Sequence, residues 1–131
     1  DLKFIEEFQP DMCGIGPFVP HKESVFANHP QGTVELTCHL LSIIRLIKPN
    51  ILLPSTTALG TIDPDGREKG ILSGANVVMP NLSPEEIRDK YELYNNKLTT
   101  GAESALQRNA LMGKTEKIGY KIVTAKGDIK K

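Results

Sequence analysis

The stretch TVELTCHLLSIIRLIKPNILLPSTT, residues 33–57, predicts a helix that leads directly into a strand. Apolar residues recur at spacings of three and four over residues 36–47, which is typical of an amphipathic helix. Thr33 can cap the start of this helix, and Pro49 stops it. Residues 51–57 are apolar at first and polar at the end, which indicates a buried strand that opens into a loop.

The same alternation continues on both sides of this stretch. Residues 11–19 are short, apolar and glycine-rich, and residues 76–80 form another apolar run, so each predicts a strand. A short helix is predicted over residues 67–72, and a better-capped one over residues 83–93. Strands and helices that alternate at these spacings give parallel strands with right-handed crossovers. The sequence therefore predicts an α/β fold, a piece of a parallel sheet or barrel.

The pattern weakens towards the end of the chain. Residues 99–131 are predicted to form an extension with a helix over residues 103–117 and a terminal strand over residues 120–124. We therefore divide the chain into a unit of residues 1–98 and this extension.

Composition excludes several classes of function. Lysine and arginine together equal aspartate and glutamate, with 16 residues each, so no net charge favours binding to nucleic acid. No apolar run approaches the length of a membrane span, and the chain opens without a signal-peptide pattern, so we expect a cytoplasmic protein. The only cysteines, Cys13 and Cys38, form no C-x-x-C pair, and Cys38 and His39 point apart on a helix. A metal site is not expected.

Candidate ligand residues follow the predicted strands, because loops at the carboxyl ends of parallel strands form the ligand face of α/β folds. The hydroxyls of Thr56 and Thr57 could hydrogen-bond a carboxylate or phosphate, and Gly14 and Gly16 would let a ligand approach the backbone closely. Each has a structural alternative that stays open. The threonines suit a strand end, the glycines suit a bend, and Met79 suits a core.

Four segments of the sequence carry a family resemblance. They are Met12-Cys13-Gly14-Ile15-Gly16-Pro17-Phe18-Val19-Pro20-His21, Thr56-Thr57-Ala58-Leu59-Gly60-Thr61-Ile62, Gly66-Arg67-Glu68 and Gly74-Ala75-Asn76-Val77-Val78-Met79-Pro80-Asn81. Together they resemble the HydE type of iron-only hydrogenase maturase. The similarity spans roughly residues 1–98, the region called the biotin and thiamin synthesis associated domain, which biotin synthase and methylornithine synthase share more loosely. The segment from Gly16 to His21 is the part that favours HydE.

The resemblance implies the C-terminal half of a radical S-adenosylmethionine (β/α)₈ barrel of the TIM type. In that family a four-iron cluster on a C-x-x-x-C-x-x-C loop cleaves S-adenosylmethionine, and this sequence contains no such loop. S-adenosylmethionine and the 4Fe-4S cluster are therefore expected in the parent protein, and neither is expected on this chain, which is inactive alone. Residues 97–112 contain no cysteine for an accessory cluster either.

The resemblance also implies a set of site residues. Positions that line the family's barrel cavity, which binds a small anionic substrate, match Pro17, Thr56, Thr57, Met79 and Tyr91 here, and Met12 lies on the strand leading to the cavity. The implied partner is the N-terminal half of the parent barrel. Because half a barrel leaves open edges and a bare apolar face, we expect the isolated chain to form a homo-oligomer.

Two alternatives stay open at this point. A fragment of a biotin synthase or methylornithine synthase relative would keep the chemistry and change the substrate. A free-standing, non-catalytic α/β binding module would have no redox chemistry.

Overall fold

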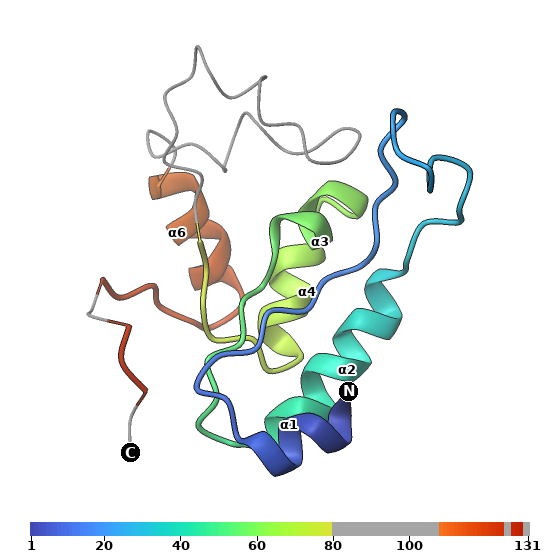
Figure 1. Cartoon of the computed structure of the whole chain (residues 1–131). Coiled ribbons are helices and arrows are strands. Elements are labelled where there is room, and N and C mark those ends of the chain that lie inside the picture. Colours follow the sequence, from blue (N-terminus) through green and yellow to red (C-terminus); the bar gives the residue numbers. More distant parts are fainter. Residues whose placement is uncertain (80–107, 125–126, 130–131) are drawn as a thin grey trace.

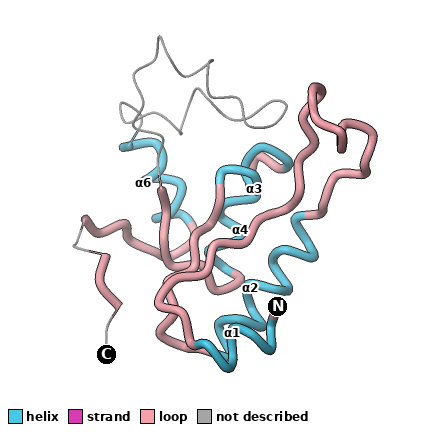
Figure 2. Tube along the Cα trace, viewed as in Figure 1, coloured by secondary structure: helices cyan, strands magenta, loops and turns pink. Residues whose placement is uncertain are grey.

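The computed structural model describes residues 1–79, 108–124 and 127–129. Helices and long extended segments make up this part of the chain (Figures 1 and 2). The helices are α1 (Leu2–Phe8), α2 (Val34–Ile47), α3 (Thr57–Ile62), α4 (Gly66–Leu72) and α6 (Arg108–Lys117). None of these helices is long and apolar enough to cross a membrane. The predicted helix over residues 83–93 and the boundary at residue 98 lie outside the described residues.

The predicted α/β fold, with a half-barrel of parallel strands, is wrong for the described residues, whose regular elements are helices. Within the described residues the three predicted strands are extended segments that touch only at isolated parallel bridges, Met12 with Leu52 and Pro54 with Val77. Around the first bridge, the amide of Cys13 donates to the carbonyl of Leu52 at 3.0 Å. Around the second, the amide of Ser55 donates to the carbonyl of Val77 at 2.9 Å. The segments run side by side without forming a sheet.

Two local features account for the missing ladder. Pro54 has no amide hydrogen to donate, so backbone pairing cannot run through the middle segment. The amide of Leu53 donates to the side-chain oxygen of Asn76 at 2.8 Å rather than to a backbone carbonyl. The side-chain amide of Asn76 in turn donates to the carbonyl of Ile51 at 3.3 Å. Asn76 thus takes up backbone groups that a continuous ladder would use.

The core forms where the helices pack against these extended segments. Its buried members come from α1, α2, α3 and the segments that follow α2 and α4. They are Ile5, Leu41, Ile44, Ile51, Leu53, Leu59 and Ala75. Leu41, Ile51, Leu53 and Leu59 are fully buried, so the strongest apolar run of the sequence does form the centre of the molecule.

Helix α2 confirms the prediction made from its periodicity. It begins after Thr33, whose hydroxyl oxygen accepts a hydrogen bond from the amide of Leu36 at 3.1 Å. It ends at Ile47, two residues before Pro49. The short helix after the turn at residues 63–66 is also confirmed as α4.

Arg45 ties the end of α2 to both neighbouring segments. Its Nε donates to the carbonyl of Gly74 at 2.9 Å, and its Nη1 donates to the carbonyls of Pro49 and Ile51, each at 2.7 Å. Gly74 has a φ of 109°, a conformation that side chains rarely adopt, and it turns the chain after α4. Partial burial of the guanidinium lowers the pKa of Arg45.

Helix α6 confirms the part of the predicted helix over residues 103–117 that is described, and the chain turns at Gly119 with a φ of 85°. The predicted strand over residues 120–124 is wrong, because these residues have no regular structure. The Lys114 ammonium lies 3.3 Å from the Glu68 carboxylate and donates to the carbonyl of Pro64 at 3.2 Å. These contacts link Lys114 of α6 to α4 and to the turn that precedes it.

Candidate ligand site around Thr56 and Thr57

Two of the predicted ligand segments come together in the structure. A β-carbon placed on Gly16 would lie 2.8 Å from the hydroxyl oxygen of Thr56, so the loop of Gly16 passes directly over that side chain. Pro17, the next residue, is buried. A β-carbon on Gly32 would lie 3.3 Å from the α-carbon of Pro17, so the chain that returns towards α2 packs against the same loop. The glycines thus allow a close approach of backbone to backbone and of backbone to Thr56.

The hydroxyl oxygen of Thr56 is buried, and it has no hydrogen-bond partner among the described residues. Leaving a buried hydroxyl unsatisfied costs about 1–3 kcal/mol, so such a group is an unusual feature of a folded protein. A ligand with a polar group at this point would satisfy it. The buried, unpartnered hydroxyl therefore supports Thr56 as a candidate ligand residue.

Thr57 lies beside a buried cation. The Nη2 of Arg67, on α4, lies 3.1 Å from the hydroxyl oxygen of Thr57, and only 5% of Arg67 is exposed. Ser55, itself 1% exposed, donates its hydroxyl to the backbone carbonyl of Arg67 at 2.9 Å. The arrangement places a guanidinium next to the Thr57 hydroxyl, which suits an anionic ligand.

Sequence reasoning missed Arg67 as a functional residue. Arg67 belongs to the segment Gly66-Arg67-Glu68, which contributes to the family resemblance, but no ligand role was predicted for it. One signal could have found it, namely an arginine in a short helix right after the threonine pair, within reach of the same side of the molecule.

The other predicted site residues are not gathered in this way. Met12 is 44% exposed and lies at the bridge to Leu52, and Met79 is 53% exposed at the end of its segment. Tyr91 lies outside the described residues. The structure thus brings Gly16, Thr56 and Thr57 together and leaves the cavity role of the two methionines and of Tyr91 as a prediction.

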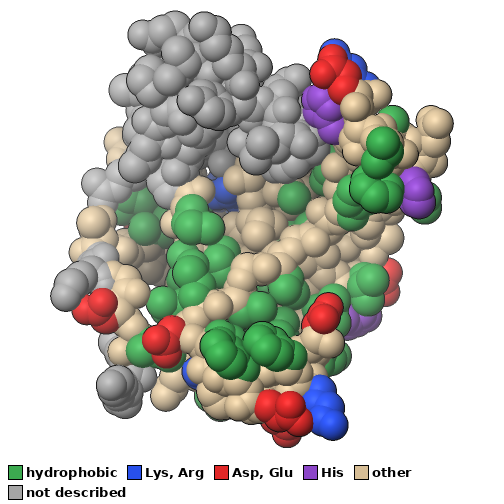
Figure 3. Space-filling view, viewed as in Figure 1, with side chains coloured by type: hydrophobic (Ala, Val, Ile, Leu, Met, Phe, Trp, Pro, Cys, Tyr) green, Lys and Arg blue, Asp and Glu red, His purple; other side chains and the backbone are tan. Residues whose placement is uncertain are grey.

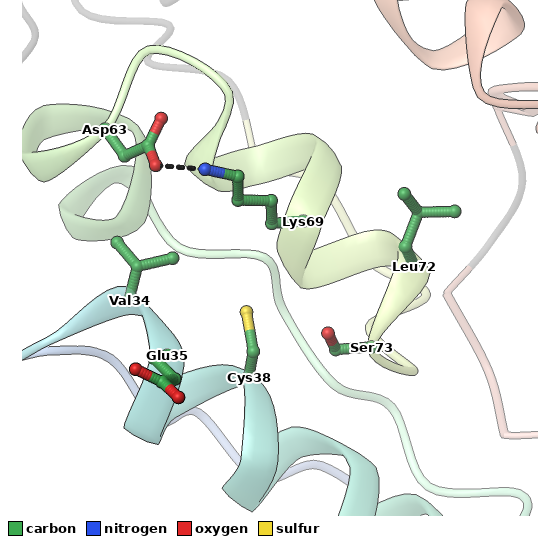
Figure 4. Close-up of a pocket in the computed structure, with 7 residues that line it drawn as sticks. All are labelled: Val34, Glu35, Cys38, Asp63, Lys69, Leu72 and Ser73. Carbon is green, nitrogen blue, oxygen red and sulfur yellow. Dashed lines mark hydrogen bonds and ion pairs between the residues drawn. The ribbon is translucent and has the colours of Figure 1, made fainter.

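A pocket of about 490 Å³ lies elsewhere, between α2 and α4 (Figure 4). Its lining residues are Val34, Glu35, Cys38, Asp63, Lys69, Leu72 and Ser73. Lys69 donates a hydrogen bond to the Asp63 carboxylate, which lowers the pKa of Asp63 and raises that of Lys69. Lys69 is thus already paired within this pocket. It contains none of the predicted site residues.

The residues present do not fit an iron–sulfur cluster. In the part of the chain that the structure describes, no group of three or more histidine, cysteine or acidic side chains is arranged to hold a metal ion. Cys13 and Cys38 are the only cysteines of the sequence, and they lie in different segments as half-buried thiols. Clusters of this kind are held by cysteine thiolates, so two separated thiols do not suffice.

In a comparison with known proteins, the chain is similar to a hydrogenase maturase, which gives the class of protein. The particular relative is the FeFe hydrogenase maturase subunit HydE of Thermotoga maritima, which is 40% identical over 121 residues. The match covers 92% of this chain and 35% of that protein, so the chain spans about a third of the length of this relative. No protein-family model matches the chain. The resemblance to HydE-type maturases predicted from the sequence is therefore confirmed.

Proposed function

We propose that the chain is part of a radical S-adenosylmethionine enzyme of the HydE type that acts in the maturation of FeFe hydrogenase. The identity of 40% over 92% of the chain carries this proposal. The cofactors of such a parent are S-adenosylmethionine and a 4Fe-4S cluster, and the cluster ligands lie outside this chain. We expect the isolated chain to be inactive for that reason.

The contribution of this chain is a share of the ligand cavity. The hydroxyls of Thr56 and Thr57 bind the anionic group of a small substrate, and the Arg67 guanidinium lies beside the Thr57 hydroxyl. The buried, unpartnered hydroxyl of Thr56 among the described residues supports this role. Pro17 forms part of the wall. The family resemblance adds three residues to the lining, namely Met12, Met79 and Tyr91.

The partner of this chain in the proposal is the rest of the parent polypeptide. A HydE-type relative is about three times as long as the matched segment, so most of such an enzyme has no counterpart here. Exposed apolar residues agree with a missing partner. Figure 3 shows hydrophobic side chains gathered on the surface over α1, and Phe4 and Phe8 of this helix are 61% and 65% exposed. We also propose a cytoplasmic location, and self-association when the chain is isolated.

A chimera tests the proposed function directly. The matched segment of Thermotoga maritima HydE is replaced by this chain, and the purified, cluster-loaded chimera is assayed for cleavage of S-adenosylmethionine to deoxyadenosine and for hydrogenase activation. We expect both activities, and we expect hydrogenase activation to fall strongly in the chimera with Thr57→Val. A chimera that is folded and carries its cluster but forms no deoxyadenosine would overturn the proposal.

A further inference from the structure

The contact between Arg67 and Thr57 fixes the direction of a hydroxyl. A guanidinium has only donors, so in the 3.1 Å contact the oxygen of Thr57 accepts and Arg67 Nη2 donates. The proton of that hydroxyl must then point away from Arg67. Among the described residues, the hydrogen bond from Arg67 is the one that the Thr57 hydroxyl forms, and no acceptor for its proton is found there.

We propose that Arg67 is a positioning residue that sets the Thr57 hydroxyl as a hydrogen-bond donor to the anionic group of the ligand. This inference rests on the proposed function, because it presupposes a ligand at the threonine pair. Arg67 acts in two ways. Its hydrogen bond holds the oxygen so that the proton faces the ligand, and its buried charge polarises the hydroxyl.

Two contacts fix the position of the Arg67 backbone. Its backbone carbonyl accepts the hydroxyl of Ser55 at 2.9 Å, which ties α4 to the segment that carries the threonines. Helix α4 also begins in tight contact with α3, since a β-carbon on Gly66 would lie only 2.1 Å from the carbonyl oxygen of Leu59. Only glycine allows that approach, and it brings Arg67 alongside α3.

Arginine suits this position better than lysine would. A guanidinium presents its donors in a fixed planar fork, whereas an ammonium is a flexible point charge. Arg67→Lys therefore keeps the charge and loses the direction of the hydrogen bond. If positioning is the role, this conservative change is almost as harmful to ligand binding as the neutral Arg67→Gln.

The test is an NMR titration of the full 131-residue chain with acetate, a small carboxylate, followed at the amide and methyl signals of Thr56 and Thr57. Wild type is expected to show a saturable shift. Arg67→Lys, Arg67→Gln and Thr57→Val are each expected to weaken acetate binding about tenfold, the loss typical of one charge-assisted hydrogen bond. Arg45→Lys is the matched control. This arginine binds backbone carbonyls elsewhere in the fold, so acetate affinity should stay within about twofold of wild type.

A double-mutant cycle separates positioning from a general structural effect. If Arg67 acts through Thr57, the variant with both Arg67→Gln and Thr57→Val binds acetate no more weakly than either single variant. Losses that multiply in the double variant would overturn the positioning role. So would normal acetate binding by both Arg67 variants.

The outcomes also distinguish this inference from the proposed site. No saturable shift in wild type, or unchanged affinity in Thr57→Val, would refute the ligand site itself. Weaker binding in Thr57→Val together with normal binding in the Arg67 variants would keep the site and refute the inference. Should the Arg67 variants fail to fold, a crystal structure of wild type with acetate decides. The carboxylate is expected on the Thr57 hydroxyl with the Arg67 contact intact, and acetate bound to Arg67 in place of Thr57 would contradict it.

Discussion

Gly16 passes so close to Thr56 that a β-carbon on the glycine would lie 2.8 Å from the hydroxyl oxygen of the threonine. The two residues come from different segments, and their contact brings the loop before α2 onto the loop after it. The space around the Thr56 hydroxyl thus depends on the absence of a side chain at position 16.

Gly16→Ala tests this contact. The added methyl would displace the Thr56 side chain, and we expect the free energy of unfolding to fall by about 1–3 kcal/mol, the usual cost of overpacking. Gly14→Ala is the control, because no atom lies within 4 Å of a β-carbon there, and it should change stability by less than about 0.5 kcal/mol. Urea unfolding measures both. Equal stability of the two variants would show that Thr56 can move aside freely.

Ser55→Ala tests the link between α4 and the threonine segment. The change leaves the buried carbonyl of Arg67 without the hydroxyl that donates to it at 2.9 Å. We expect a loss of about 1–3 kcal/mol in the free energy of unfolding. Ser24→Ala removes a hydroxyl that accepts from the amide of Phe26 in an exposed turn, so its effect should be below about 0.5 kcal/mol. A Ser55 variant as stable as the Ser24 variant would contradict the role of this hydrogen bond.

Arg45→Met tests the tie between α2 and its neighbouring segments. It removes the donors to the carbonyls of Gly74, Pro49 and Ile51, and we expect the free energy of unfolding to fall by about 3 kcal/mol. Arg45→Lys can form only part of these contacts, so its free energy of unfolding should lie between those of wild type and Arg45→Met. Thermal and urea unfolding can both be followed by circular dichroism. A methionine variant within about 0.5 kcal/mol of wild type would show that water replaces these contacts at little cost.

The Asp63–Lys69 pair predicts a pH dependence at both ends of the scale. The hydrogen bond from Lys69 lowers the pKa of Asp63 in the folded protein. The contribution of Asp63 to folding stability is therefore present above the pKa that Asp63 has in the unfolded chain, and it disappears as pH falls through the pKa of the folded protein. The same hydrogen bond raises the pKa of Lys69 in the folded protein. The contribution of Lys69 to folding stability is therefore present below the pKa that Lys69 has in the unfolded chain, and it disappears as pH rises through the pKa of the folded protein. The melting temperature of Asp63→Asn should therefore lie below that of wild type near neutral pH and converge with it at both extremes.

Asp11→Asn provides the control for that experiment, since Asp11 is exposed and forms no ion pair among the described residues. Its melting curve should follow wild type across the whole pH range. A constant gap between wild type and Asp63→Asn at acid pH would contradict the ionic origin of the effect.

Self-association of the isolated chain is a further prediction. Phe4 and Phe8 stack with ring centroids 5.0 Å apart on the outside of α1, where burial against another molecule would remove apolar surface from water. We expect oligomers at micromolar concentration by sedimentation velocity, and a shift towards monomer in the variant with Phe4→Ser and Phe8→Ser. Val25→Ser, at a loop position that is 91% exposed, should leave the distribution unchanged. A wild-type chain that sediments only as monomer would rule the prediction out.

Local pattern was sufficient for α2, for α4 and for the family, whereas α3 begins at Thr57, where the sequence predicted the end of a strand. The periodicity of residues 36–47, the cap at Thr33 and the stop at Pro49 determined α2, because these signals act within one or two turns. The similarity to HydE-type maturases was equally readable from short segments. The continuous parallel sheet was wrong, although both the alternation of the segments and the family resemblance had predicted it.

The tertiary structure decided how the extended segments pair and what surrounds the site. Only the fold shows Asn76 forming hydrogen bonds with the backbone groups of Ile51 and Leu53. Likewise, the sequence selected Thr56 and Thr57, whereas the contacts of Gly16 and Arg67 with them depend on how distant segments pack. The physical reason is the separation along the chain of the residues that interact. Caps and periodicity act between neighbours along the chain, but a hydrogen bond across the fold depends on where the backbone places both partners.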